Sequence, residues 1–403
     1  MDTVIDASFF DPRSQRFIDD PYPFYAALRR DDPVHRSANG FWMLTRYGDI
    51  RQALREPALS SEPSHFAVVH PRNRSRYVAA DVAFNVVNFM DPPRHTRCRK
   101  AIVQAFRERL DLFSVDLTEV AGEHLDRYRT AGRIDLVSEF GTPFSLSVIC
   151  RFVGFPEGDI ALLKSWSDRF FYLFNTIPSR EVLDQVNRDL VAFREYVRSI
   201  LVQRRTDPRD DLISRLIAAH DEEGLLDDME IIDTAMLIFA VGVENVDSGI
   251  GNCVLTLLQH EDQLKRLVEK PDLLNNAIDE CLRYEPLSQF VPRVAKSDVD
   301  INGSKIRKHE VVLLALASAN RDPDVFPDPD RLDIERTNVQ HMAFGRGHHS
   351  CIGAPLVIRE YRAAIGTIVR NLPGLSLRNG ANAWTSQMGH RWLKSLNVTF
   401  RPY

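Results

Sequence analysis

A ten-residue loop around Cys351 combines a thiol, two histidines, an arginine and three glycines. It reads Phe344-Gly345-Arg346-Gly347-His348-His349-Ser350-Cys351-Ile352-Gly353. Glycines on both sides of the cysteine permit a tight backbone beside a flat ligand. Apolar residues recur at helical spacing from Ala354 to about Asn371, so the cysteine precedes a helix N-terminus. Free N–H groups and the helix dipole there lower the pKa of a thiol and favour the thiolate, the form that binds iron.

The other cysteines lack any such context. They are widely spaced and form no C-x-x-C pair, so the sequence indicates neither a disulfide framework nor a zinc ribbon. His348 and His349 have no second cluster with zinc-ligand spacing. We expect buried, structural thiols at Cys98, Cys150, Cys253 and Cys281.

The loop string F-G-x-G-x-H-x-C-x-G resembles the haem-binding loop of the cytochrome P450 family, and further motifs in the family order cover nearly the whole chain. A buried structural cysteine in a glycine-rich turn is the alternative, but it leaves six matching positions unexplained. The resemblance implies haem b as cofactor, O2 as co-substrate, Cys351 as the axial iron ligand and Phe344 as a haem contact. Such a thiolate donates electron density to the iron and favours O–O cleavage.

Four basic residues match the family's haem-propionate positions. His95 and Arg99 are four apart on a predicted helix and project together. Arg293 and His349 match the other two positions by resemblance. Partly buried propionates need such cationic or hydrogen-bonding partners.

Glu280 and Arg283 are three apart in a helical stretch that Pro286 ends, so they can pair on one face. They resemble the family's E-x-x-R motif, which a second arginine completes; Arg336 matches that position. The resemblance implies a structural role, in which these residues hold the segment leading into the cysteine loop.

Residues 230–260 are predicted to form one long helix with a Gly and a polar pair at its apolar centre. It resembles the family helix that crosses the distal haem face with the motif A-G-x-D/E-T-T. Gly242 and Glu244 match, but Asn245 and Val246 replace the two threonines. In the family the first threonine supports proton delivery during oxygen activation. We therefore assign proton entry to Glu244, with Asp247 and Ser248 as weaker candidates on the next turn, and a catalytic role to Asn245.

An amide cannot relay a proton as a rotating hydroxyl does. Asn245 can hold a water that relays protons, a substrate hydroxyl can replace the threonine, or the chemistry can be atypical. The first hypothesis is thus a monooxygenase that hydroxylates or epoxidises its substrate. The alternatives are a haem-thiolate enzyme of atypical chemistry, such as cyclisation, coupling or nitration, and a non-enzymatic haem gas sensor.

Segments that match the family's substrate contacts are apolar with a few amides. They predict a hydrophobic small-molecule substrate with some polar groups, although core packing explains any single one of them as well. The C-terminal half resembles bacterial members that tailor polyketides and related secondary metabolites. The candidate substrate contacts are Phe84, Phe89, Phe174, Val241, Gln289, Phe290 and Met388.

Electrons must come from a partner, since no flavin or iron–sulfur segment is recognised; the resemblance implies a ferredoxin and a ferredoxin reductase. Arg107, Arg109 and Arg346 are basic residues that can meet an acidic ferredoxin, or simply be solvated.

A net charge of −5 argues against nucleic-acid binding. We expect a monomer.

These residues require a mainly α fold with small β-sheets and a long central helix, the cytochrome P450 fold by resemblance. We expect one domain over residues 1–403, with strands at 41–45 and 311–316. Met1 to Phe10 carries two acids and no basic residue, which is unlike a secretory signal. The longest apolar runs fall short of the ~20 residues of a membrane span, so we expect a cytoplasmic protein.

Overall fold

The computed structural model describes residues 11–378 and 384–402, without the side chains of residues 221–223. The segment Met1 to Phe10, on which the expectation about a leader rests, lies outside the described residues. The α-helices are α1 Gln15–Asp19, α2 Tyr22–Asp31, α3 Tyr47–Ala53, α4 Val78–Asn85, α5 Arg94–Leu112, α6 Leu117–Asp126, α7 Thr142–Val153, α8 Ile160–Phe170, α9 Arg180–Thr206, α10 Leu212–Glu223, α11 Asp228–Gln259, α12 Glu261–Glu269, α13 Leu274–Tyr284, α14 Leu316–Ala319 and α15 Ala354–Asn371. Short helical turns that bear on the site are η3 Val87–Phe89, η4 Leu136–Gly141, η6 Phe171–Phe174 and η8 Gly347–His349.

The strands form small sheets. A five-stranded sheet has the order β1-β2-β8-β5-β3, in which β2 pairs with β8 in parallel and β5 with β8 antiparallel. A three-stranded sheet has the order β4-β10-β9, and β6 pairs with β7 as a hairpin. The strands are β1 Val34–Arg36, β2 Trp42–Leu44, β3 Leu59–Ser60, β4 Arg133–Asp135, β5 Val291–Ala295, β6 Val299–Ile301, β7 Ser304–Ile306, β8 Val311–Leu314, β9 Ser376–Leu377 and β10 Asn397–Thr399.

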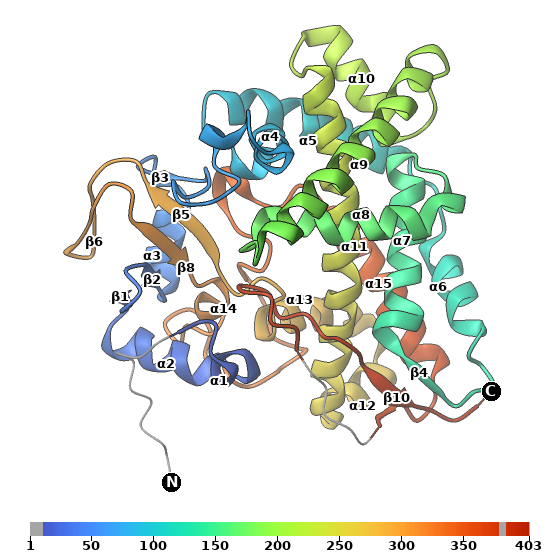
Figure 1. Ribbon diagram of the computed structural model, residues 1–403. Coiled ribbons are helices and arrows are strands. Elements are labelled where there is room, and N and C mark those ends of the chain that lie inside the picture. Colours follow the sequence, from blue (N-terminus) through green and yellow to red (C-terminus); the bar gives the residue numbers. More distant parts are fainter. Residues whose placement is uncertain (1–10, 379–383, 403) are drawn as a thin grey trace.

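The sheet-rich and helix-rich parts lie on opposite sides of the molecule, and α11 runs through the helical part as its long central element (Figure 1). Each part has its own hydrophobic core. The cysteine loop lies between the two cores. Met342, two residues before the loop, belongs to the sheet-side core, while Phe344 and Ile352 in the loop pack against the helical core. The loop is therefore held from both sides.

The two helices that the sequence places at the site form as predicted. Asp227 caps α11, accepting from the backbone N–H of Glu230, whose side chain accepts in return from the N–H of Asp227. The observed bounds of α11 lie within two residues of the predicted 230–260. Helix α15 has its predicted bounds, with Pro355 in its first turn.

One helical stretch, Leu136–Val153, has the length and mean hydropathy of a membrane span. It is 72% buried inside the protein, where it packs against α11, as a core helix does.

Candidate functional site

The cysteine loop is closed by backbone hydrogen bonds and anchored by side chains on both flanks. The Cys351 N–H donates to the Phe344 carbonyl at 2.9 Å, and the Gly345 N–H donates to the Met342 carbonyl at 2.8 Å. Gly347 has φ +78°, and a Cβ there would lie 2.9 Å from the carbonyl oxygen of Leu54. Glycine is thus required at this position, both for its backbone conformation and for the close approach.

The Cys351 thiol is accessible although protein surrounds it. Burial raises its pKa, while the backbone N–H groups of Gly353 and Ala354 and the charge of Arg99 act in the opposite direction. The helix N-terminus therefore favours the thiolate as predicted, but in the protein alone burial outweighs it. Direct coordination deprotonates a thiol outright.

The four predicted propionate residues come together beside this loop. The rings of His95 and His349 lie 4.1 Å apart. Burial lowers the pKa of His95 to about 4 and that of His349 to about 3, so both rings are neutral near pH 7. Arg99 and Arg293 contribute to these shifts, which places their charges near the two rings.

Among the described residues, the anion nearest to these groups is Asp91, and it pairs with Lys296 at 3.2 Å. Burial lowers the pKa of Arg293 to about 10, and its side chain donates only to the carbonyl of Pro292, at 2.8 Å. Arg99 donates to the Ser350 carbonyl at 2.6 Å. Among the described residues, neither arginine forms an ion pair, and the buried Nε2 of His95 has no hydrogen-bond partner. Buried cations require an anion, and the two carboxylates of a haem fit this donor set.

The Glu280–Arg283 pair has the structural role predicted for it. Both side chains are 0% exposed and are joined by two hydrogen bonds of 2.7 and 2.8 Å. Arg336 completes the group, with its Nε 3.2 Å from Glu280 Oε1. Arg283 also donates to the Asn320 carbonyl, and the Asn320 side chain accepts from the Met342 N–H at 2.6 Å. The pair is thereby linked to the start of the cysteine loop.

Glu244 lies at the centre of α11, facing α8. Its carboxylate pairs with the Lys164 ammonium at 2.9 Å and accepts from the Ser167 hydroxyl at 3.3 Å. Burial raises the pKa of Glu244 to about 8, with Lys164 opposing and Asp247 and Asp168 adding to the shift. The pKa of Lys164 is raised, chiefly by Glu244, so Lys164 stays charged while Glu244 exchanges a proton near neutral pH.

Asn245 carries a buried side-chain oxygen that has no hydrogen-bond partner among the residues that the structure describes. Its backbone carbonyl accepts from the Tyr361 hydroxyl at 3.4 Å. Tyr361 packs so closely on α11 that a Cβ at Gly249 would lie 1.6 Å from its hydroxyl oxygen. The neighbouring acid Asp247 is engaged by the Thr142 hydroxyl at 2.7 Å, and burial raises its pKa to about 6.

The predicted substrate contacts fall into two groups. The rings of Phe89 in η3 and Phe174 in η6 lie 5.0 Å apart, although 85 residues separate them in sequence. Phe290 is buried beneath Gly389, whose added Cβ would lie 3.1 Å from the ring, and Met388 next to it is 39% exposed. Val241 is partly buried on α11.

The side chains of Phe84 and Gln289 are engaged by other residues of the protein. The guanidinium groups of Arg74 and Arg94 lie 3.7 and 3.8 Å from the Phe84 ring, which leaves less of the ring for a substrate. The Gln289 amide donates to the Pro286 carbonyl at 2.8 Å, while its Oε1 has no hydrogen-bond partner within residues 11–378 and 384–402.

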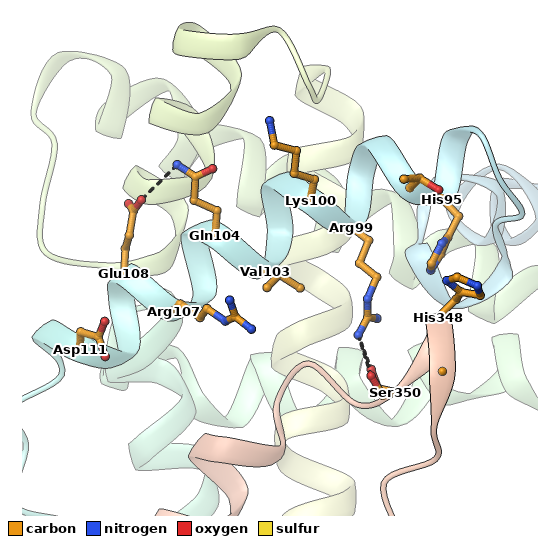
Figure 2. A pocket seen from close by; sticks show the side chains of 12 residues that line it. His95, Arg99, Lys100, Val103, Gln104, Arg107, Glu108, Asp111, His348 and Ser350 are labelled. Atoms are coloured by element: carbon orange, nitrogen blue, oxygen red, sulfur yellow. Dashed lines mark hydrogen bonds between the residues drawn. The ribbon is translucent and has the colours of Figure 1, made fainter. Parts of the chain in front are cut away.

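A groove of about 650 Å³ runs between α5 and the cysteine loop (Figure 2). Arg99, Lys100, Arg107 and His348 line it, with Glu108 and Asp111 at its far end.

The expectation that Arg109 is a surface cation is wrong. Its side chain is 6% exposed and pairs with Asp210 at 3.1 Å. It also donates to the carbonyls of Arg151 and Phe152. Arg346 is half-buried and donates to the Gln340 carbonyl.

Sequence reasoning missed Lys164 and Trp392. Lys164 supplies the counter-charge for Glu244, and Phe171 links Phe174 to Trp392 through ring contacts of 5.8 and 4.9 Å. Local spacing carries no signal for the Lys164–Glu244 and Phe171–Trp392 contacts, because each joins segments far apart in the chain.

Residues 160–373 match the model of the family described as Cytochrome P450. The chain is 38% identical over 397 residues to the vitamin D(3) 25-hydroxylase of Pseudonocardia autotrophica, with 96% of each chain covered. It is 33% identical over 361 residues to the mycinamicin IV hydroxylase/epoxidase of Micromonospora griseorubida, covering 88% of each. The crystal structure of CalO2 superposes with a TM-score of 0.91 at 33% identity, over 98% of this chain and 99% of that one.

The fold, the cysteine loop and these relatives all point to the same family. The mainly α architecture with small β-sheets is that of the solved relatives, and the relatives are named as hydroxylases and monooxygenases. The relatives therefore favour the enzyme over the alternative of a haem gas sensor. The chain belongs to the cytochrome P450 family and is a haem-thiolate monooxygenase.

Proposed function

We propose that the enzyme hydroxylates or epoxidises a hydrophobic small molecule, a polyketide-like or related secondary metabolite, with O2 and electrons from a ferredoxin and its reductase. The observation that carries the substrate class is the contact between Phe89 and Phe174, two predicted substrate residues from distant segments. Aromatic side chains that converge in this way favour apolar ligands. The named substrates of the relatives, vitamin D(3) and mycinamicin IV, are in keeping with this class.

In this proposal Cys351 is the iron ligand, Phe344 packs against the haem, and His95, Arg99, Arg293 and His349 hold the propionates. The haem, when bound, supplies the site at which O2 is activated. Arg99 has a double role, because it also donates to the Ser350 carbonyl and so joins α5 to the loop that carries the thiolate.

Glu244 supplies protons in this proposal. Its pKa of about 8 allows both protonation states near neutral pH, and Lys164 at 2.9 Å fixes the position of its carboxyl group. The side-chain oxygen of Asn245, which has no partner in the described part of the chain, can accept from a water that replaces the family's threonine hydroxyl.

The remaining contacts to the substrate are assigned to Val241, Gln289, Phe290 and Met388, with the edge of Phe84. The groove beside the cysteine loop is assigned to the ferredoxin, because Lys100 and Arg107 line it and carry positive charge that an acidic partner complements. We place the reaction in the cytoplasm, where a reductase of this kind finds NAD(P)H. The enzyme acts as a single-domain monomer over residues 1–403.

The experiment reconstitutes the haem-loaded enzyme with a ferredoxin, its reductase and NADPH. A library of macrolides, sterols and fatty acids is screened for shifts of the haem spin state, and bound compounds are then turned over under isotopically labelled O2. One labelled oxygen atom in the product is expected. A product that forms without label refutes hydroxylation and epoxidation.

Asn245 gives a second candidate a specific basis, since it replaces the residue that serves proton delivery in the family. On this candidate the enzyme performs cyclisation, coupling or nitration. The same turnover would then yield an oxidised product without label from O2, whereas a labelled product excludes these reactions for that substrate.

A further inference from the structure

His390 ends a run of ring contacts that three separate segments build. Phe89 lies 5.0 Å from Phe174, which lies 5.8 Å from Phe171. Phe171 meets Trp392 at 4.9 Å, and Trp392 meets His390 at 4.9 Å. The first members of this run are predicted substrate contacts, and the imidazole of His390 is the polar ring at its end.

A tight turn fixes the position of His390. Its N–H donates to the Gln387 carbonyl at 3.2 Å, and Gly389 in the turn has φ +81°. An antiparallel bridge pairs His390 with Ser288. Residues directly opposed in such a bridge project on the same face of the strand pair, so Ser288 and His390 present their side chains to the same side.

The His390 ring is partly accessible but is surrounded by protein. Burial lowers the pKa of His390 to about 4, although the carbonyl of Met388 acts to raise it. The ring is therefore neutral near pH 7, with one N–H, for which the Met388 carbonyl is an acceptor, and one acceptor nitrogen. Its Nδ1 is buried and has no hydrogen-bond partner among the described residues.

The nearest cation in sequence is not available to this face. Arg391 pairs with Glu285 at 2.7 Å and donates to the Ile18 carbonyl at 2.6 Å. Its guanidinium also lies 3.8 Å from the Trp384 ring. Arg391 therefore supplies no counter-charge to a carboxylate beside His390, and burying a carboxylate without a counter-charge is costly.

We propose that His390 selects substrates that carry a neutral hydroxyl group on an apolar skeleton, with the imidazole and the Ser288 hydroxyl as its hydrogen-bond partners. This selection rests on the proposed function, because it assumes that the substrate lies against the aromatic run. It separates hydroxylated lipophiles from fatty-acid carboxylates as the substrate class.

The test uses N-alkylimidazoles, whose imidazole binds haem iron whatever the native substrate is. Sets of several chain lengths end in a methyl, a hydroxyl or a carboxylate, and Kd is measured from the shift of the haem spectrum. In the wild type we expect the hydroxyl end to improve binding about three- to tenfold over the methyl end at the best chain length, the net value of one hydrogen bond. The carboxylate end should bind most weakly.

His390→Phe keeps an aromatic ring and removes both nitrogens, so the hydroxyl advantage, taken as the ratio of the methyl-ended to the hydroxyl-ended Kd in each variant, should disappear. His124→Phe is the matched control, since His124 in α6 also has its pKa lowered by burial; it should keep the advantage. An equal advantage in His390→Phe, no advantage at any chain length in the wild type, or tightest binding of the carboxylate overturns the selection. Absence of any spectral shift with all ligands instead refutes the haem site itself.

Discussion

Replacing Glu280 with Gln tests the buried group that holds the cysteine loop. The Glu280 carboxylate accepts from Arg283 at 2.7 and 2.8 Å, from Arg336 at 3.2 Å and from the Asp333 N–H at 3.0 Å. The variant removes the negative charge and places an NH2 donor against a guanidinium. Removing one partner of a buried ion pair costs about 3–5 kcal/mol, because the other charge stays buried without compensation. We expect a loss of unfolding free energy of that size.

The assay is denaturant unfolding, followed by fluorescence and by the haem absorbance. Loss of haem should accompany the loss of stability, since Arg283 reaches the loop through Asn320 and Met342. Glu335→Gln is the matched control. It makes the same chemical change at a pair on the surface, where the Glu335 side chain is 38% exposed, and should change little. If both variants were as stable as the wild type, the buried group would not hold the loop.

Three further changes test the site. Glu244→Gln should slow turnover about a hundredfold by removing a proton donor, measured as kcat. Because the pKa of Glu244 is raised from 4.5 to about 8, the folded protein binds the extra proton between these values, and stability falls as pH rises through them. The variant should lack this part of the pH dependence in unfolding measurements, and an unchanged profile would contradict the shift. Arg293→Leu should release haem more readily in transfer to apomyoglobin; unchanged release would remove its propionate role. Asn245→Thr should give at least the wild-type yield of product per NADPH, and a lower yield would mean that the amide itself is needed.

Local patterns in the sequence predicted the elements that carry the chemistry. Helix α15 has its predicted bounds, and the buried Glu280–Arg283–Arg336 group was found from spacing and resemblance. These features depend on residues close in sequence, or on motifs that can be recognised in the amino-acid sequence itself.

Contacts between residues distant in sequence could not be predicted, because they depend on which segments pack together. The burial of a charged residue likewise depends on the segments that cover it. Arg109 was expected to be a surface cation but is buried and pairs with Asp210. The sequence did not indicate that Lys164 pairs with Glu244. Phe84 stays a predicted substrate contact, but the sequence did not indicate that guanidinium groups of Arg74 and Arg94 lie over its ring. Such outcomes follow from the tertiary fold rather than from local spacing.

The spectrum of the reduced enzyme with carbon monoxide tests the assignment of Cys351 most directly. The wild type should show the red-shifted Soret band of a thiolate-bound haem. Cys351→Ala should lose that shift, and Cys253→Ala, at a buried cysteine of α11, should keep it. A wild-type Soret band without the shift, or a shift that survives in Cys351→Ala, would contradict the account.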